Sequence, residues 1–278
     1  MSNALKTAVL LAALTGVLLL VGQLVGGVRG LTIAIIFSVL INFVMYYSSD
    51  RIALAMYRAH PADEHKDREL FQTVRELAQR ADLPMPKVYI IPSQTPNAFA
   101  TGRNPQHASV AVTQGIQGLL SKHELKGVIA HELAHVKHRD ILIATVAATI
   151  AGIISYVAMM ARWAAIFGGF GGRDGDNNIV SLLVLAVLTP ILAVIIQLAI
   201  SRSREFAADA GGAKIMGHGE YLANALQKLE AANKRHPLRF GTESGASLFI
   251  VNPFAGRAFI KLFSTHPPVK ERVKRLRT

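Results

Sequence analysis

The sequence contains no cysteine, and only 17% of its 278 residues are charged. Without thiols the chain forms neither disulfide bonds nor thiolate metal sites. A soluble domain is about one quarter charged, so this chain has too few charges to cover a globule in water. Its hydrophobic content of 51% and its lack of a short repeat exclude intrinsic disorder, collagen and coiled coils. The composition therefore favours a membrane protein.

The chain contains long apolar stretches without any charged residue. Four of them approach or exceed the roughly 20 residues that cross the hydrocarbon core as a helix. They are residues 7–28, 30–49, 141–161 and 177–201. Four such stretches in one short chain argue against buried core helices, and a cleaved signal peptide would explain only the first of them. We expect two transmembrane helical hairpins, residues 1–49 and 141–201, of which the second could instead pack against the soluble part.

The basic residues indicate the topology. The net charge is +12, and 26 of the 30 lysines and arginines lie in residues 50–140 and 202–278. A basic excess in a soluble protein suggests nucleic-acid binding, but these residues are not interleaved with aromatic ones. The positive-inside rule predicts that both segments and both termini face the cytoplasm. In the basic tail, residues 270–277, we expect a solvated helix face, with anionic lipid headgroups as the alternative partner.

The two hydrophilic segments, 50–140 and 202–278, are together long enough to bury one domain-sized core. Apolar periodicity and alternation predict helices and strands within them. The expected elements are helices over 66–81, 121–138 and 220–232 and from about 203, and strands over 87–91, 97–101 and 109–113. Ser121 and Glu124 form a capping-box pattern that begins the second of these helices. We expect a small α+β domain that the second hairpin interrupts.

One motif carries the chemistry, His131-Glu132-Leu133-Ala134-His135, an H-E-x-x-H pattern inside an expected helix. Residues four apart share a helical face, so His131 and His135 can bind one Zn²⁺. Glu132 is not placed as a ligand with them, but it can reach a water on the metal and serve as general base. Zinc lowers the pKa of that water to about 7 and polarises a scissile carbonyl. A chance match on a polar helix is the alternative.

A catalytic zinc site needs a third protein ligand. The extension of the motif that would bring a third histidine is missing, because the chain has Ala144 and Thr145 in that region. Glu205 is the candidate, from a second helix that begins after the fourth apolar run. Asp209 lies four residues later on the same face and can accept a hydrogen bond from a ligand histidine. Two solvated carboxylates at a helix start are the alternative.

These residues together resemble the HtpX family, bacterial membrane-bound zinc metalloproteases related to the CAAX prenyl protease. The resemblance covers essentially the whole chain and includes His266-Pro-Pro near its end. It implies a gluzincin-type protease with His131, His135 and Glu205 as ligands of one Zn²⁺ and Glu132 as catalytic base. It also implies that His266 approaches the site and stabilises the oxyanion. The segment from Asn97 to Gly102 resembles the family's edge strand, against which an extended substrate pairs, and Asn97, Ala98 and Phe99 are the residues expected to contact it.

The resemblance further implies proteolysis of misfolded or damaged membrane proteins in the bacterial inner membrane, as part of envelope stress and quality control. The expected partners are membrane-protein and peptide substrates and the lipid bilayer, without nucleic acid. Two alternatives remain open. A CAAX-type prenyl protease would share the chemistry, although those relatives have more membrane helices. A non-enzymatic membrane chaperone or adaptor would keep the fold and lose the activity.

Overall fold

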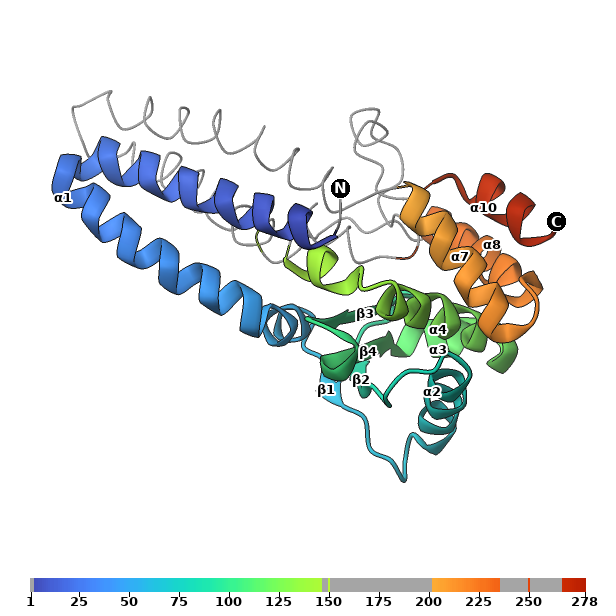
Figure 1. Ribbon diagram of the computed structural model, residues 1–278. Coiled ribbons are helices and arrows are strands. Elements are labelled where there is room, and N and C mark those ends of the chain that lie inside the picture. The colour runs from blue at the N-terminus through green and yellow to red at the C-terminus, as the bar shows by residue number, and fades with distance from the viewer. Residues whose placement is uncertain (1–2, 147–149, 151–201, 236–249, 251–266) are drawn as a thin grey trace.

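The computed structural model describes residues 3–146, 150, 202–235, 250 and 267–278. Its elements are α1 (Asn3–Met56), β1 (His60–Pro61), α2 (Arg68–Arg80), β2 (Lys87–Ile91), β3 (Ala98–Gly102), η1 (Pro105–His107), β4 (Ala108–Thr113), α3 (Gln114–Leu119), α4 (Lys122–Lys137), α7 (Arg202–Met216), α8 (Glu220–Arg235) and α10 (Val269–Leu276). A further helical segment covers residues 141–146. The chain is therefore mainly helical with one small mixed sheet, which confirms the expected fold class at that level (Figure 1).

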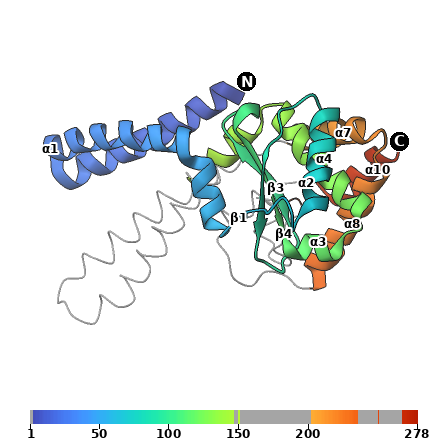
Figure 2. The same ribbon diagram turned by 90° about the horizontal axis from the view of Figure 1, so that it is seen from below.

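The helix α1 is a hairpin that projects away from the sheet (Figures 1 and 2). It bends at Gly27, whose φ of 55° is a conformation that glycine adopts without a side-chain clash. Asn42 Nδ2 in the second arm donates a hydrogen bond of 2.7 Å to Thr15 Oγ1 in the first. The turn expected around the glycines is therefore present. The second arm continues to Met56, seven residues beyond the expected end of the apolar run.

The second arm of α1 exposes its large apolar side chains. Among the described residues, Gly27–Met56 is the one helix long and apolar enough to cross a membrane, and Leu5–Gly16 is a shorter apolar helix. Large apolar side chains such as Ile36 and Phe43 are 68% and 61% exposed. A continuous apolar surface of this kind is unstable in water and fits a hydrocarbon solvent. Most of the residues expected to form the second hairpin, 147–149 and 151–201, lie outside the described residues.

The sheet has the strand order β1-β2-β4-β3. The strands β2 and β4 are parallel, whereas the β1–β2 and β3–β4 pairs are antiparallel. The expected strands over 97–101 and 109–113 are present, each displaced by one residue at its start. The topology places β3 at an edge of the sheet, next to the end of α1 and to α4.

Strand alternation divides the core between the two faces of the sheet. On one face, Val88, Ala100 and Val110 belong to a cluster with residues of α2, α4, α8 and α10. On the other face, Phe99 and Ala111 pack against Ala53, Leu54 and Tyr57 at the end of α1. The end of α1 nearest the sheet is therefore packed against it. A second apolar cluster joins Met45 of α1 to Ile143, Val146 and Ile150.

Candidate metal centre

The helix α4 begins where the sequence predicts. Ser121 N donates to Glu124 Oε2 at 2.8 Å, and Glu124 N donates to Ser121 Oγ at 3.4 Å, which completes the capping box. Glu124 is buried and also accepts a hydrogen bond of 2.8 Å from Lys228 Nζ of α8. The helix then carries His131, Glu132 and His135 into the interior, where His131 is 1% and Glu132 6% exposed.

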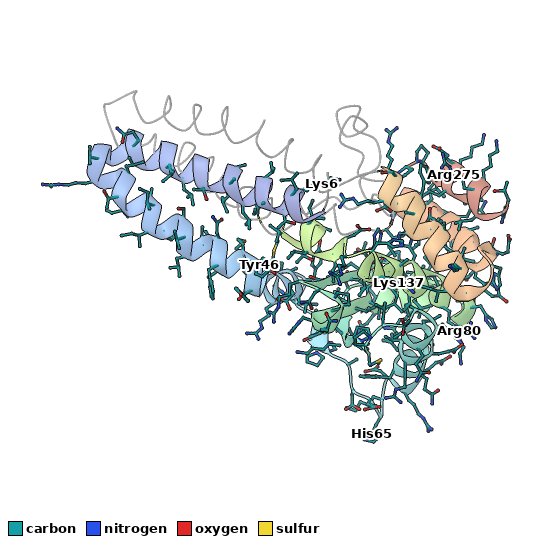
Figure 3. All side chains as sticks on the ribbon, viewed as in Figure 1. Lys6, Tyr46, His65, Arg80, Lys137 and Arg275 are labelled. Carbon is teal, nitrogen blue, oxygen red and sulfur yellow. The ribbon has the colours of Figure 1, made fainter. Side chains whose placement is uncertain are left out.

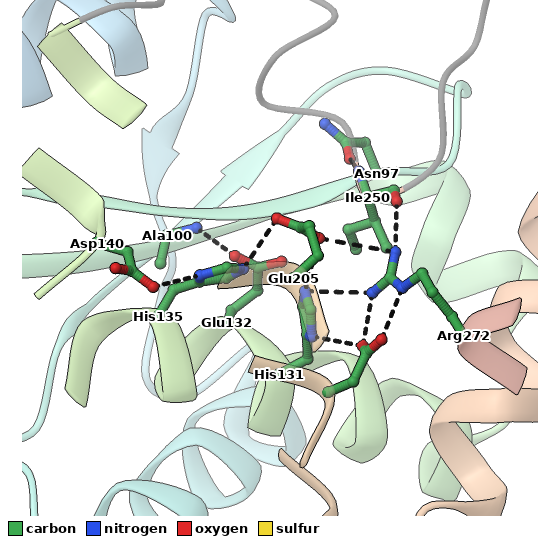
Figure 4. Close-up of polar contacts among 10 residues, drawn as sticks. Asn97, Ala100, His131, Glu132, His135, Asp140, Glu205, Ile250 and Arg272 are labelled. Carbon is green, nitrogen blue, oxygen red and sulfur yellow. Dashed lines mark hydrogen bonds and ion pairs between the residues drawn. The ribbon is translucent and has the colours of Figure 1, made fainter. Parts of the chain in front are cut away.

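The helix α7 brings Glu205 to the two histidines because α4 and α7 pack very closely. A Cβ on Gly212 of α7 would lie 2.9 Å from the backbone nitrogen of His131, so this position admits no side chain. Glu205 Oε1 lies 3.6 Å from His135 Nε2, and Glu205 Oε2 lies 3.8 Å from His131 Nε2 (Figure 4). One ligand atom from each of the three residues lies within 4.8 Å of the others.

These distances fit a tetrahedral zinc ion. Zinc–ligand bonds of 2.0–2.1 Å at tetrahedral angles separate two ligand atoms by about 3.4 Å. The observed nitrogen–oxygen separations of 3.6 and 3.8 Å involve different oxygens of Glu205 and exceed this value by a few tenths of an ångström. With one ligand atom from each residue the three lie within 4.8 Å of one another, so binding of zinc would draw them closer together. Two imidazoles and one carboxylate form a ligand set typical of catalytic zinc sites. His131, His135 and Glu205 are thus placed to hold zinc, as expected from the sequence.

Each ligand histidine contacts a carboxylate through its other ring nitrogen. His131 Nδ1 lies 3.0 Å from Asp209 Oδ1, and His135 Nδ1 lies 3.2 Å from Asp140 Oδ2 (Figure 4). The first contact has the distance of an ion pair but not the angle of a good hydrogen bond. A carboxylate on Nδ1 holds the proton there and leaves Nε2 to the metal. Asp209 was singled out in the sequence for a hydrogen bond from a ligand histidine, and the structure gives it the 3.0 Å contact with His131; Asp140 was not predicted.

The electrostatics of the site favour positive charge. Burial lowers the pKa of His135, but the nearby carboxylates of Asp140, Glu205 and Glu132 outweigh it and raise this pKa to about 9. Burial would raise the pKa of Asp209, yet the contacts with His131 and Arg272 lower it to about 2. Only a neutral imidazole binds zinc, so binding displaces the proton that these carboxylates stabilise on His135.

A buried arginine completes the site from α10. Arg272 is 0% exposed, and its Nε and Nη2 donate to Asp209 at 2.9 and 2.7 Å. Its Nη1 donates to the backbone oxygen of Ile250 at 3.1 Å, and Nη2 lies 3.4 Å from His131 Nε2. The expectation of a solvated basic tail is therefore wrong for this residue. Charge alone did not reveal that one face of the helix packs into the core.

Glu132 faces the same centre without joining the ligand cluster. Its Oε2 accepts a hydrogen bond of 2.9 Å from the backbone nitrogen of Ala100 in β3. This contact fixes a carboxylate beside the three ligands and ties it to the edge strand. No sequence signal pointed to Ala100 as its partner.

The structure divides the three residues expected to pair with a substrate. Thr113 N donates to Asn97 O at 2.9 Å, so Asn97 directs its backbone toward β4. Antiparallel alternation then directs Phe99 toward β4 and Ala98 and Ala100 outward. The Asn97 side chain accepts a hydrogen bond of 3.2 Å from Ile250 N. The remaining expected site residue, His266, lies outside the described residues.

Two partners of the site were missed although the sequence held a signal for each. Asp140 is the last charged residue before an apolar run and follows His135 by five positions. Arg272 lies at the i+3 position of a helix whose residues Val269 and Val273 are buried, a core-facing position.

Comparisons with known proteins agree with this geometry. The model of peptidase family M48 matches residues 64–278. A "Protease HtpX homolog" of Thermococcus kodakarensis is 55% identical over 98% of this chain and 94% of its own length. Another, of Syntrophotalea carbinolica, is 55% identical over 99% of this chain and 98% of its own length.

A solved structure shares the fold. The crystal structure of S. mikatae Ste24p superposes with a TM-score of 0.52 at 19% sequence identity, over 99% of this chain and 65% of the Ste24p chain. The chain thus spans just under two thirds of that protein. The family match, the HtpX homologues and the His-His-Glu cluster lead to one conclusion: the chain belongs to peptidase family M48 as an HtpX-type zinc metalloprotease of the membrane.

Proposed function

We propose that the chain is an endopeptidase in which Glu132 is the general base. Bound zinc, held by His131, His135 and Glu205, supplies Lewis acidity and lowers the pKa of a water to about 7. The Glu132 carboxylate takes a proton from the attacking water and returns it to the nitrogen of the leaving amine. The observation that carries this proposal is the Glu132 carboxylate beside the three ligands, held by the amide of Ala100.

The substrates proposed are misfolded or damaged membrane proteins, as part of envelope quality control. The support is the short distance between the site and the apolar segments. Asp140, which contacts His135, immediately precedes the helical segment 141–146, and residues of this segment pack against α1. Loops and ends of membrane proteins that lie near the bilayer surface would be within reach. Residues 97–102 would offer the outward backbone groups of Ala98 and Gly102 and the carbonyl of Ala100 to an extended substrate, while the Ala100 nitrogen stays with Glu132.

The proposed topology has two hairpins, residues 1–49 and 141–201, and one protease domain, residues 50–140 and 202–278. Lys6 and Tyr46 lie near the domain ends of the two arms of α1, which supports placing the N-terminus on the side of the domain (Figure 3). By the positive-inside rule that side is the cytoplasm of a bacterial inner membrane. We include His266 as a residue that stabilises the oxyanion, from the position of its His-Pro-Pro sequence.

The two alternatives differ in what they predict. A CAAX-type prenyl protease would cleave prenylated peptides near their ends and not unmodified membrane proteins. A chaperone or adaptor would protect such proteins without cleaving them. Cleavage that stops with a chelator and returns with zinc would exclude the second.

The decisive experiment compares wild type with Glu132→Gln in lipid nanodiscs, with a misfolded membrane protein as substrate. The amide keeps the shape and loses the base, so zinc content stays at one ion per chain while the rate falls roughly 10²–10⁴-fold. Glu69→Gln, an exposed glutamate of α2, is the matched control and cleaves normally. Near-normal turnover by Glu132→Gln would show that another group activates the water.

A further inference from the structure

Residues 140–146 contact the metal centre and its neighbouring strand at two separate places. At the first, Asp140 contacts the ligand His135 at 3.2 Å. More than one turn later, Thr145 Oγ1 lies 2.9 Å from Thr101 Oγ1 of β3, and both side chains are 0% exposed. The segment therefore joins the apolar run that follows α4 both to a zinc ligand and to the edge strand.

The direction of the threonine hydrogen bond follows from the number of protons. Thr145 Oγ1 also donates to the backbone oxygen of Ile141, at 2.6 Å. A hydroxyl carries a single proton, so Thr145 has none left for Thr101. Thr101 is therefore the donor of the pair and Thr145 the acceptor.

Thr101 directly follows the residue that holds Glu132. The Ala100 nitrogen donates to Glu132 Oε2, and the planar peptide that joins Ala100 to Thr101 is rigid. On the same face of β3, Phe99 packs against Tyr57 with ring centroids 5.2 Å apart. The strand is thus held on the hairpin side at two alternate residues, and the position of the Ala100 amide depends on both.

We propose that Thr101 and Thr145 are positioning residues that hold the Ala100 amide against the Glu132 carboxylate. This inference rests on the proposed role of Glu132 as general base. Through the two threonines, the packing of residues 141–146 against α1 sets the position of the base. Asp140, on the same stretch of chain, orients the ligand His135 instead. Loss of the threonine contact should therefore lower kcat, and loss of the Asp140 contact should lower zinc affinity.

The test uses the full chain in lipid nanodiscs with an unmodified peptide substrate. Thr145→Val keeps the shape and removes the acceptor; we expect kcat to fall about tenfold, as for a lost buried hydrogen bond, with KM and zinc content as in wild type. Thr145→Ser restores the hydroxyl and the rate. Thr101→Val gives the same loss, and the double variant is no slower than either single one, because both remove one interaction. Thr73→Val, at a buried threonine of α2, is the matched control with wild-type kcat.

Several outcomes would overturn the inference. These are wild-type kcat in a folded Thr145→Val, losses that add in the double variant, or a loss of zinc that accounts for the loss of rate. If Thr145→Val does not fold, the other two variants decide. A reduced kcat in Thr101→Val together with a wild-type kcat in Thr145→Ser supports the inference, and any other combination of the two kcat values refutes it. Failure of the proposed function is distinguishable, because it appears as normal turnover in Glu132→Gln whatever the threonine variants do.

Discussion

The second arm of α1 and the helix α4 follow opposite rules of burial. On α1, Ile33 and Ile36 are each 68% exposed while Ser38 is 3% exposed. On α4, Glu124 and Glu132 are each 6% exposed and His131 only 1%. One helix directs its largest apolar side chains outward, and the other directs its ionisable side chains inward.

The contrast shows which environment each helix is built for. An apolar surface outside requires hydrocarbon as solvent, where the helix satisfies its backbone internally. Ionisable groups inside require partners, since an unpaired buried charge is very costly. On α4 each has one: Glu124 has Lys228, Glu132 has the Ala100 amide, and His131 has Asp209. Four predictions test this comparison.

The largest effect is expected where a partner of a buried charge is removed. Arg272→Met leaves Asp209 buried without its cation, and losing one partner of a buried ion pair costs about 3–5 kcal/mol. We expect this loss in the free energy of unfolding in detergent micelles, together with weaker zinc binding through His131. Lys274→Met, at an exposed position of the same helix, is the control and changes little. A folded Arg272→Met within 1 kcal/mol of wild type would mean that the pair adds almost nothing.

The next effect tests the outward face of α1. Ile36→Arg places a charge in the middle of the apolar arm, which costs about 2.5–3.5 kcal/mol at the centre of a membrane helix. We expect much less of the chain to resist carbonate extraction from membranes. Gln79→Arg, on the exposed face of α2, is the matched change in water and stays within about 0.5 kcal/mol of wild type. If Ile36→Arg resisted carbonate extraction as well as Gln79→Arg does, α1 would not lie in the bilayer.

The third effect concerns the contact between Asp140 and the ligand His135. Asp140→Asn keeps the size of the side chain but weakens the hold on Nδ1 of His135. Loss of such a partner typically lowers metal affinity about 10–100-fold, which competition with a chelator measures. Asp82→Asn at an exposed turn is the control and binds zinc normally. Zinc affinity within threefold of wild type in Asp140→Asn would show that Asp140 does not orient the ligand.

The sequence predicted what depends on neighbours along the chain. The start of α4 is a local feature and is present, and the four-residue spacing of His131 and His135 on this helix brings both to one cluster with Glu205. The turn at Gly27 is local as well. The Zn²⁺ expected from the motif agrees with the family and with the cluster.

What the sequence did not predict depends on how distant segments approach. The Ala100 amide reaches Glu132 only because β3 is the edge strand beside α4, and Thr101 meets Thr145 across 44 positions. Arg272 looked like one of several solvated charges, since a helix with many basic residues does not show by composition which one is buried. Its place between two buried valines was the available signal.

The smallest expected effects come from variants that separate the two roles of Glu124, which caps α4 and pairs with Lys228 of α8. Burial would raise the pKa of Glu124, but hydrogen bonds from Lys228 and Ser121 outweigh it and lower this pKa. A carboxyl with a lowered pKa stabilises the fold above its unfolded pKa, and this stabilisation is lost as the pH falls through the folded value.

Ser121→Ala removes a cap worth about 1 kcal/mol, or roughly 2–4 °C in melting temperature. Glu124→Gln keeps a capping side chain and loses the ion pair, so we expect a smaller loss at pH 7 that shrinks as the pH falls below the unfolded pKa and is gone below the lowered folded pKa. Thermal unfolding of both variants across pH 3–8 measures this, and a loss in Glu124→Gln that stays constant with pH would assign the whole effect to capping.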